Sequence, residues 1–230
     1  MIPLDWQNES LRSGIARMLQ ARSVALRRGE RPIGWKLAFG APTFLERFGL
    51  TGPVIGFLTD AGLRSTGSEV PTAGWTRAVA EPEIAAHIGK DVDDLADIEA
   101  AIYALGPAIE LADIDIPPED IEAALAGNVY HRAVVLGDAD RGRAGAGVDG
   151  LTGNVFRDGE QVAEVEDMEA HTGSFIDILR HTGALLQAAG ETFRAGEVVI
   201  LGSLVPPLAV EPGQEIRFEV TSMSPISVRV

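Results

Sequence analysis

Apolar residues recur at helical spacing in several segments of the chain. Between residues 10 and 28 they follow one helix face, and Gly29 comes next as a stop signal. A second long helix is predicted from Ser174, which fits a capping box, to Ala189. Three shorter helices are expected over residues 42–49, 91–105 and 117–126.

The segments between these helices are rich in β-branched and other apolar residues, which predicts strands. They are expected over residues 34–40, 53–58, 79–88, 107–112, 133–136, 198–201, 208–210 and 215–220. Several strands follow one another in hairpin-like succession while the helices cluster separately, so the pattern favours an α+β fold. We interpret residues 1–31 as an N-terminal helical segment packed on the core, and residues 32–230 as a single domain that carries any catalytic site.

One glycine-rich stretch, Gly145-Ala-Gly147-Val-Asp-Gly150, matches the GxGxxG pattern of dinucleotide-binding loops. That function requires a strand directly before the glycines and a helix that opens at them. Residues 151–160 are instead typical of a strand and a turn. We therefore interpret residues 141–150 as a surface loop that binds no nucleotide.

Composition narrows the possible partners and chemistry. The 230 residues hold 34 Asp and Glu against 19 Lys and Arg, a net charge of −15 that repels phosphate backbones and anionic lipid. Neither nucleic acid nor a membrane is expected as a partner. The chain has no cysteine, so a metal site must use oxygen or imidazole ligands. There is no basic leader with an apolar run and no long apolar stretch, which favours a cytoplasmic protein.

Two glutamates, Glu81 and Glu83, flank Pro82 in a predicted strand. Residues i and i+2 of a strand project from the same face about 7 Å apart, so the two carboxylates could close on one cation. Pro82 has no backbone N–H to donate to a neighbouring strand, which suits an edge or irregular position of a sheet. The alternative is a pair of solvated carboxylates on a strand edge.

A third glutamate, Glu110, lies in a run of small and apolar residues. A buried carboxylate needs a partner, because desolvation without one is costly. On a strand, Ala108 and Ala112 share its face and leave room for a metal and a substrate. The alternative partner is an arginine in an ion pair.

Four further residues with charged or titratable side chains are candidates for the functional site. Lys36 is a lone charge in an apolar strand, and its ammonium could reach either the surrounding water or a substrate carboxylate or enolate. Asp60 ends the next strand and could cap a turn or orient Lys36. His87 and His131 have no metal-ligand spacing, and each could reach a pocket or be an ordinary surface or core histidine.

These pieces form an ordered set between about Pro32 and Val220. The set consists of Gly34-Trp-Lys36-Leu, Gly56-Phe-Leu-Thr-Asp60, Ala80-Glu81-Pro-Glu83-Ile-Ala, Pro107-Ala-Ile-Glu110-Leu, Asn128 before Val134-Val-Leu-Gly137, and Gly190-Glu-Thr-Phe-Arg-Ala-Gly196-Glu-Val-Val-Ile-Leu-Gly202-Ser203. In order and spacing it resembles the 2-keto-4-pentenoate hydratase/4-oxalocrotonate decarboxylase branch of the fumarylacetoacetate hydrolase superfamily.

The resemblance implies a mixed β-roll with flanking helices, assembled as a homo-oligomer, a dimer or larger. It implies that Mg²⁺ or Mn²⁺ is held by Glu81, Glu83 and Glu110. Lys36 and Asp60 would share the active site with the metal and serve proton transfer and orientation.

The implied function is that of a metal-dependent lyase in aromatic compound catabolism, acting on a small 2-keto acid or its 2-hydroxydienoate enol. Such an acid can chelate a hard cation, which stabilises an enolate. Hydration is the main expectation. The alternatives are decarboxylation of an oxalocrotonate-like substrate, C–C bond hydrolysis of an acylpyruvate, and an inert metal-binding partner subunit. A binding protein whose carboxylates form ordinary salt bridges is a further alternative.

The chain also departs from the family pattern in two segments. Residues 38–42 and 166–175 both differ from the usual sequences of the hydratases. We expect both segments to line the pocket, so the resemblance leaves the exact substrate open. Asn128 matches the pattern less specifically than the charged residues do.

Overall fold

The computed structural model describes residues 3–230, so residues 1 and 2 of the predicted N-terminal segment lie outside it. The α-helices are α1 (Glu9–Arg27), α2 (Pro42–Phe48), α3 (Ile98–Ala101), α4 (Ile121–Ala126) and α5 (Phe175–Ala188). The strands are β1 (Pro32–Ala38), β2 (Val54–Thr59), β3 (Leu63–Arg64), β4 (Ser68–Glu69), β5 (Ala78–Ile88), β6 (Ile102–Asp113), β7 (His131–Leu136), β8 (Gly153–Arg157), β9 (Glu160–Val165), β10 (Val198–Ile200), β11 (Leu208–Ala209), β12 (Glu215–Val220) and β13 (Ile226–Arg229).

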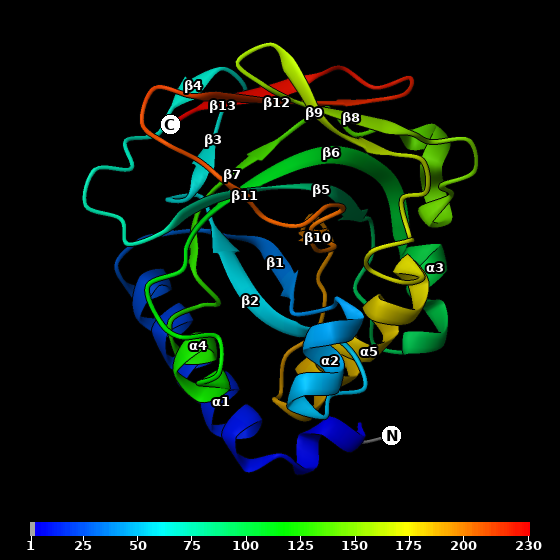
Figure 1. Ribbon diagram of the computed structural model, residues 1–230. Helices are drawn as coiled ribbons and strands as arrows, with labels where there is room; N and C mark the ends of the chain where they lie inside the picture. Colours follow the sequence, from blue (N-terminus) through cyan, green and yellow to red (C-terminus); the bar gives the residue numbers. More distant parts are fainter. Residues whose placement is uncertain (1–2) are drawn as a thin grey trace.

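The larger sheet is curled into a roll (Figure 1). Its strands run in the order β2-β1-β10-β5-β6-β7-β3, and β11 also pairs with β5. The first and last strands of this order, β2 and β3, are consecutive in the chain, so the sheet must bend back on itself. The pairs β1–β10 and β3–β7 are parallel and the others antiparallel. The predicted α+β class and mixed β-roll are confirmed.

A second sheet, in the order β4-β13-β12-β8-β9, lies over β5 and β6 on the side away from β1 and β2 (Figure 1). Its apolar side chains, such as Phe218 and Val228, join the main hydrophobic cluster. The outer face of β5 and β6 is therefore covered by this core. Their inner face is left for charged side chains.

Helix α1 begins at Asn8, whose side-chain oxygen accepts a hydrogen bond from the backbone N–H of Leu11 at 3.1 Å. Its buried residues Leu11, Ile15 and Met18 belong to the same hydrophobic cluster as the sheets. The helix thus packs on the core. The division into segments 1–31 and 32–230 stays a prediction.

The helix predicted over residues 91–105 is mostly wrong. Only Ile98–Ala101 is α-helical, preceded by a 3-10 turn over Leu95–Asp97. From Ile102 the chain is a strand, because Ile102 pairs with Ile88 in the long β5–β6 ladder. Ladder pairing across the sheet overrides the local helical spacing of the apolar residues.

The glycine-rich segment forms short 3-10 turns over Arg141–Ala146 and then leads into the β8–β9 hairpin. The strand and turn predicted over residues 151–160 are therefore present. Within the described part of the chain, no helix is both long and apolar enough to cross a membrane.

Candidate metal centre and pocket

The register of β5 and β6 brings three carboxylates together. Glu81 stands directly opposite Glu110, and Glu83 follows two residues later on the same face of β5. A carboxylate oxygen from each lies within 4.8 Å of the others. Glu83 and Glu110 are buried, while Glu81 is partly exposed toward the pocket. The structure thus gathers all three predicted ligands at one point.

The sequence suggested an edge or irregular position for Pro82, and Pro82 lies at an irregular position of a central strand. On one side β5 pairs with β6, where Pro82 faces Ile109. On the other side β10 pairs only as far as Ala85, and β11 begins at Ala80. Pro82 therefore stands at a gap between two short strands. The gap tolerates a residue without a backbone N–H.

Lys36 reaches this cluster from β1, across the inside of the roll. Its Nζ lies 2.9 Å from Glu110 Oε2 and donates to the backbone carbonyl of Val129 at 2.9 Å. The side chain is 2% exposed, so its ammonium does not extend into bulk water. The ion-pair partner of Glu110 is thus a lysine, not an arginine.

Two further contacts orient the carboxylates. His131 Nδ1 donates to Glu110 Oε1 at 2.7 Å, from behind the cluster. The backbone N–H of Gly202, just after β10, donates to Glu83 Oε2 at 2.8 Å. Such outer hydrogen bonds fix the orientation of metal ligands in metal sites.

The cluster holds more negative charge than Lys36 offsets. Burial, and then the charge of Glu110, raise the pKa of Glu81 to about 7. Burial and the two neighbouring carboxylates also raise the pKa of Glu83 well above its ordinary value. For Glu110 burial acts in the same direction, but Lys36 and His131 outweigh it and hold its pKa below the ordinary value. A cation bound between the three would relieve this repulsion.

Asn128 supports Lys36 through the backbone. Its amide donates to the carbonyl of Phe57 at 2.9 Å, and its oxygen accepts from the N–H of Phe57 at 2.7 Å. Asn128, Val129 and Tyr130 have φ values of 60°, 48° and 68°, a left-handed conformation that is strained for a β-branched residue such as Val129. This turn presents the Val129 carbonyl to Lys36. A Cβ on Gly56 would lie 2.8 Å from the Asn128 oxygen, so this close approach requires glycine.

Asp60 is not brought to this site. Lys36 pairs with Gly56, and Asp60 lies four residues further along, about 13 Å away at the other end of the strand. There its carboxylate accepts from the backbone and side chain of Arg31, both at 2.8 Å. The expectation that Asp60 orients Lys36 in an active site is therefore corrected. His87 is also remote, and packs its ring 5.8 Å from that of Tyr103.

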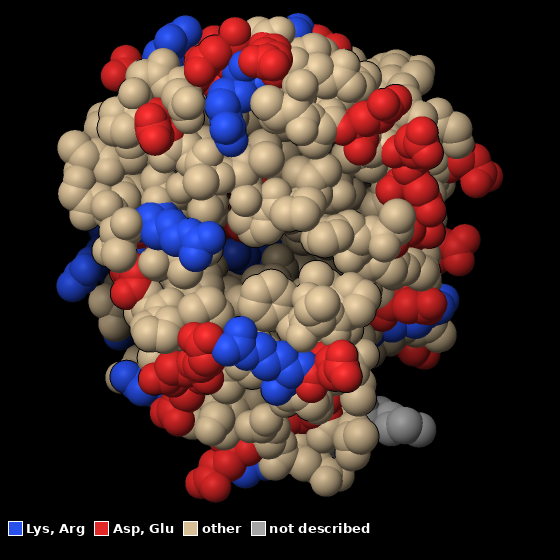
Figure 2. All heavy atoms as spheres, viewed as in Figure 1, with Lys and Arg blue, Asp and Glu red and all other residues tan. Residues whose placement is uncertain are grey.

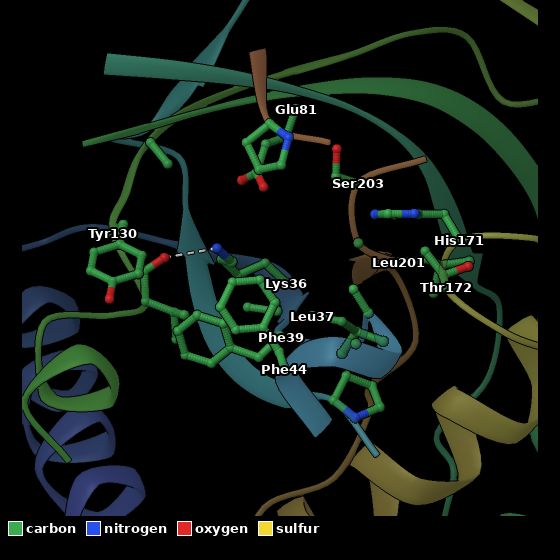
Figure 3. Close-up of a pocket in the computed structure, with 18 of the residues that line it drawn as sticks. Lys36, Leu37, Phe39, Phe44, Glu81, Tyr130, His171, Thr172, Leu201 and Ser203 are labelled. Atoms are coloured by element: carbon green, nitrogen blue, oxygen red, sulfur yellow. Dashed lines mark hydrogen bonds between the residues drawn. The ribbon is translucent and has the colours of Figure 1, made fainter. Parts of the chain in front are cut away.

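A pocket with a cavity volume of about 120 Å³ opens beside the glutamates. Figure 2 shows this face hollowed at its centre, with mostly uncharged side chains around the opening. In Figure 3, Glu81 and Lys36 line one end, Tyr130 stands on one side and His171 projects from the opposite side. Phe39 belongs to the wall beneath Lys36, with other apolar side chains.

Several lining residues were not identified individually from the sequence. Phe44, Tyr130 and His171 all face the pocket. The segments 38–42 and 166–175, which were expected to line it, do contribute Phe39 and His171. Departure from the family pattern was thus the available signal for Phe39 and His171. Nothing in the sequence around Phe44 or Tyr130 distinguished them from core aromatics.

The chain is similar to several known proteins. The 4-oxalocrotonate decarboxylase of a Pseudomonas species is 28% identical over 93% of this chain and 83% of its own length. A 2-hydroxyhexa-2,4-dienoate hydratase from Comamonas testosteroni is 26% identical over 92% and 82%. A 2-keto-4-pentenoate hydratase from Burkholderia vietnamiensis is 27% identical over 80% and 72%.

Among solved structures, the fold is similar to that of 4-oxalocrotonate decarboxylase from Pseudomonas putida G7, complexed with magnesium and adipate. The TM-score is 0.83 at 21% identity, over 93% of this chain and 84% of that chain. Residues 47–230 match the family model described as fumarylacetoacetate (FAA) hydrolase C-terminal. The chain therefore belongs to the fumarylacetoacetate hydrolase C-terminal family.

Proposed function

We propose that this protein is a divalent-metal-dependent lyase that hydrates a small 2-hydroxydienoate, the enol of a 2-keto acid. The observation that carries the proposal is the convergence of Glu81, Glu83 and Glu110 beside Lys36 at one end of an apolar pocket. The names of the hydratase relatives support the substrate class.

The three glutamates fit Mg²⁺ or Mn²⁺. Both are hard cations that prefer oxygen ligands, and each glutamate offers an oxygen within 4.8 Å of the other two. Burial, and then the charge of neighbouring carboxylates, raise the pKa of Glu81 and of Glu83, and a dication would relieve the charge repulsion. Crystals of a decarboxylase with the same fold hold magnesium or calcium. When bound, the metal supplies Lewis-acid stabilisation of the enolate oxygen.

The remaining chemistry falls to side chains of the pocket. The Lys36 ammonium, held by Glu110 and Val129, is placed to attract the substrate carboxylate or the developing enolate. Hydration needs a proton at the terminal carbon of the dienol, followed by addition of water at the adjacent carbon. His171 faces the pocket, and histidine is the most frequent general acid and base in enzymes. We assign proton transfer at the distal carbons to His171, and not to Asp60.

Decarboxylation is the second candidate. The relative named 4-oxalocrotonate decarboxylase is 28% identical to this chain, and a decarboxylase structure shares the fold. The same enolate would form when carbon dioxide leaves, and Lys36 would stabilise it equally. No water would be needed at the distal carbon, so His171 would be dispensable.

The experiment is turnover of 2-hydroxypenta-2,4-dienoate and of 4-oxalocrotonate at saturating Mg²⁺. Loss of dienoate absorbance with formation of a 4-hydroxy-2-keto acid supports hydration, and carbon dioxide release from oxalocrotonate supports decarboxylation. EDTA and the Glu83→Gln variant are the controls that abolish either activity. Failure to turn over either substrate in a folded, Mg²⁺-loaded protein would refute the enzyme proposal and leave an inert subunit or a binding protein.

We further infer a homo-oligomer, a dimer or larger, from the family resemblance. Sedimentation of the purified protein tests this inference. A monomer at micromolar concentration would contradict it.

A further inference from the structure

We propose that the distal part of this pocket accepts an uncharged, apolar substrate tail and rejects a second carboxylate. This inference rests on the proposed function, because it assumes that a 2-keto acid binds with its polar head at the glutamates and Lys36. It selects a substrate class among 2-keto acids, which share that head but differ in the tail.

The wall beyond Lys36 is aromatic. Phe39 packs against Phe44 at 5.3 Å between ring centroids and against Tyr130 at 6.1 Å. All three rings line the pocket. Aromatic faces provide a large apolar contact surface for a hydrocarbon or aryl group. Such a surface offers nothing that replaces the hydration of a carboxylate.

Within the pocket lining, permanent positive charge lies at the head. Among the described residues that line it, Lys36 is the only lysine or arginine. Its ammonium already contacts Glu110 and the Val129 carbonyl. Figure 2 shows basic side chains at the rim of the hollow, but they lie outside the lining. His171 projects from the side opposite Tyr130 (Figure 3), away from the aromatic wall.

Acidic residues lie near Tyr130, and two of them are paired with arginines, Asp115 with Arg132 and Glu119 with Arg47. Burial, and then the charges of Asp115, Glu119 and Asp120, raise the pKa of Tyr130 to about 12. Tyr130 is therefore neutral and offers no positive charge to a second carboxylate. The net charge of −15 acts in the same direction over longer distances.

The test compares two ligands that differ only at the tail. 2-Oxohexanoate ends in a methyl group, and 2-oxoadipate ends in a carboxylate at the same place. Their dissociation constants are measured by calorimetry at saturating Mg²⁺, with pyruvate as the head group alone. We expect 2-oxohexanoate to bind at least tenfold more tightly than pyruvate, because its methylenes and methyl group leave water for the apolar wall. It should also bind at least tenfold more tightly than 2-oxoadipate, because the second carboxylate would lose its hydration against that wall.

A positive charge placed on the wall should reduce this preference. Phe44→Lys should move the ratio of the two dissociation constants at least tenfold toward 2-oxoadipate. Thr43→Lys is the matched control, because Thr43 is exposed on the same helix and lies outside the pocket lining. It adds the same charge and should leave the ratio unchanged.

The outcomes separate the two proposals. If pyruvate binds but 2-oxoadipate binds as tightly as 2-oxohexanoate, the apolar-tail inference is overturned and the proposed function stands. If none of the three ligands binds in the presence of Mg²⁺, the proposed function fails and the inference falls with it. The wild-type comparison decides the matter even if Phe44→Lys does not fold.

Discussion

Replacing Lys36 by methionine removes the one buried positive charge that faces the three glutamates. Methionine has a similar length and can fill the same space, so the change isolates the loss of the ammonium. Lys36 lies 2.9 Å from Glu110 and is 2% exposed. Its loss leaves Glu110 buried beside two other carboxylates, with the hydrogen bond from His131 Nδ1.

Two effects should follow, one on stability and one on rate. Breaking a buried ion pair from one side costs about 3–5 kcal/mol, so the metal-free variant should lose that much stability toward unfolding. Saturating Mg²⁺ should restore most of it, because the cation replaces the missing charge, and the affinity for Mg²⁺ should not fall. Turnover should drop by roughly a hundredfold or more, equivalent to about 2.7–4 kcal/mol of transition-state stabilisation.

The assay combines urea denaturation, with and without Mg²⁺, and turnover of 2-hydroxypenta-2,4-dienoate at saturating Mg²⁺. Lys90→Met is the matched control, since Lys90 is the other lysine of the chain. It is 49% exposed, and its nearest carboxylate is 3.9 Å away. It should retain wild-type turnover. Equal rates for folded Lys36→Met and wild type would remove Lys36 from the mechanism.

Three other changes give simple outcomes. Asp60→Asn should leave turnover within about twofold of wild type, because Asp60 pairs with Arg31 far from the pocket. A hundredfold loss of turnover would show that Asp60 does act in the reaction. Asn128→Ala removes both hydrogen bonds to Phe57 and places alanine at a φ of 60°. Urea denaturation should therefore show a loss of about 2–4 kcal/mol in the free energy of unfolding. An unchanged midpoint would contradict the role of Asn128 in holding this turn. Burial lowers the pKa of His87 below 6.5, so the unfolded chain binds a proton that the folded protein does not, and stability falls as the pH drops below about 6.5. His87→Phe should lose less stability than wild type between about pH 7 and about pH 5, and an equal loss in both would exclude this contribution.

The glutamate cluster could be predicted from the sequence because most of its features depend on neighbouring residues in the chain. The alternation of a strand places Glu81 and Glu83 on one face, and the apolar surroundings of Glu110 indicate that it is buried. The pairing of Glu81 with Glu110 is long-range. Local patterns do not specify such a register. The family resemblance indicated that Glu110 joins Glu81 and Glu83.

The errors arose where tertiary structure decides the outcome. Asp60 follows Lys36 closely in sequence and lies on the neighbouring strand, but the antiparallel register carries it to the far end of β2. Leu105 fits a helical stripe, but its backbone N–H donates to the Asp140 carbonyl at 3.2 Å in an isolated bridge. Phe44 and Tyr130 were not predicted as pocket residues, because they come together around Phe39 only when α2 and the turn before β7 are both in place.

The central claim is that Glu81, Glu83 and Glu110 hold one divalent cation at the head of the pocket. The most direct test is a crystal structure with Mn²⁺ and oxalate, in which anomalous scattering locates the metal. We expect one Mn²⁺ within about 2.0–2.3 Å of an oxygen from each glutamate. A cation bound elsewhere, or three carboxylates that point away from it, would contradict the account.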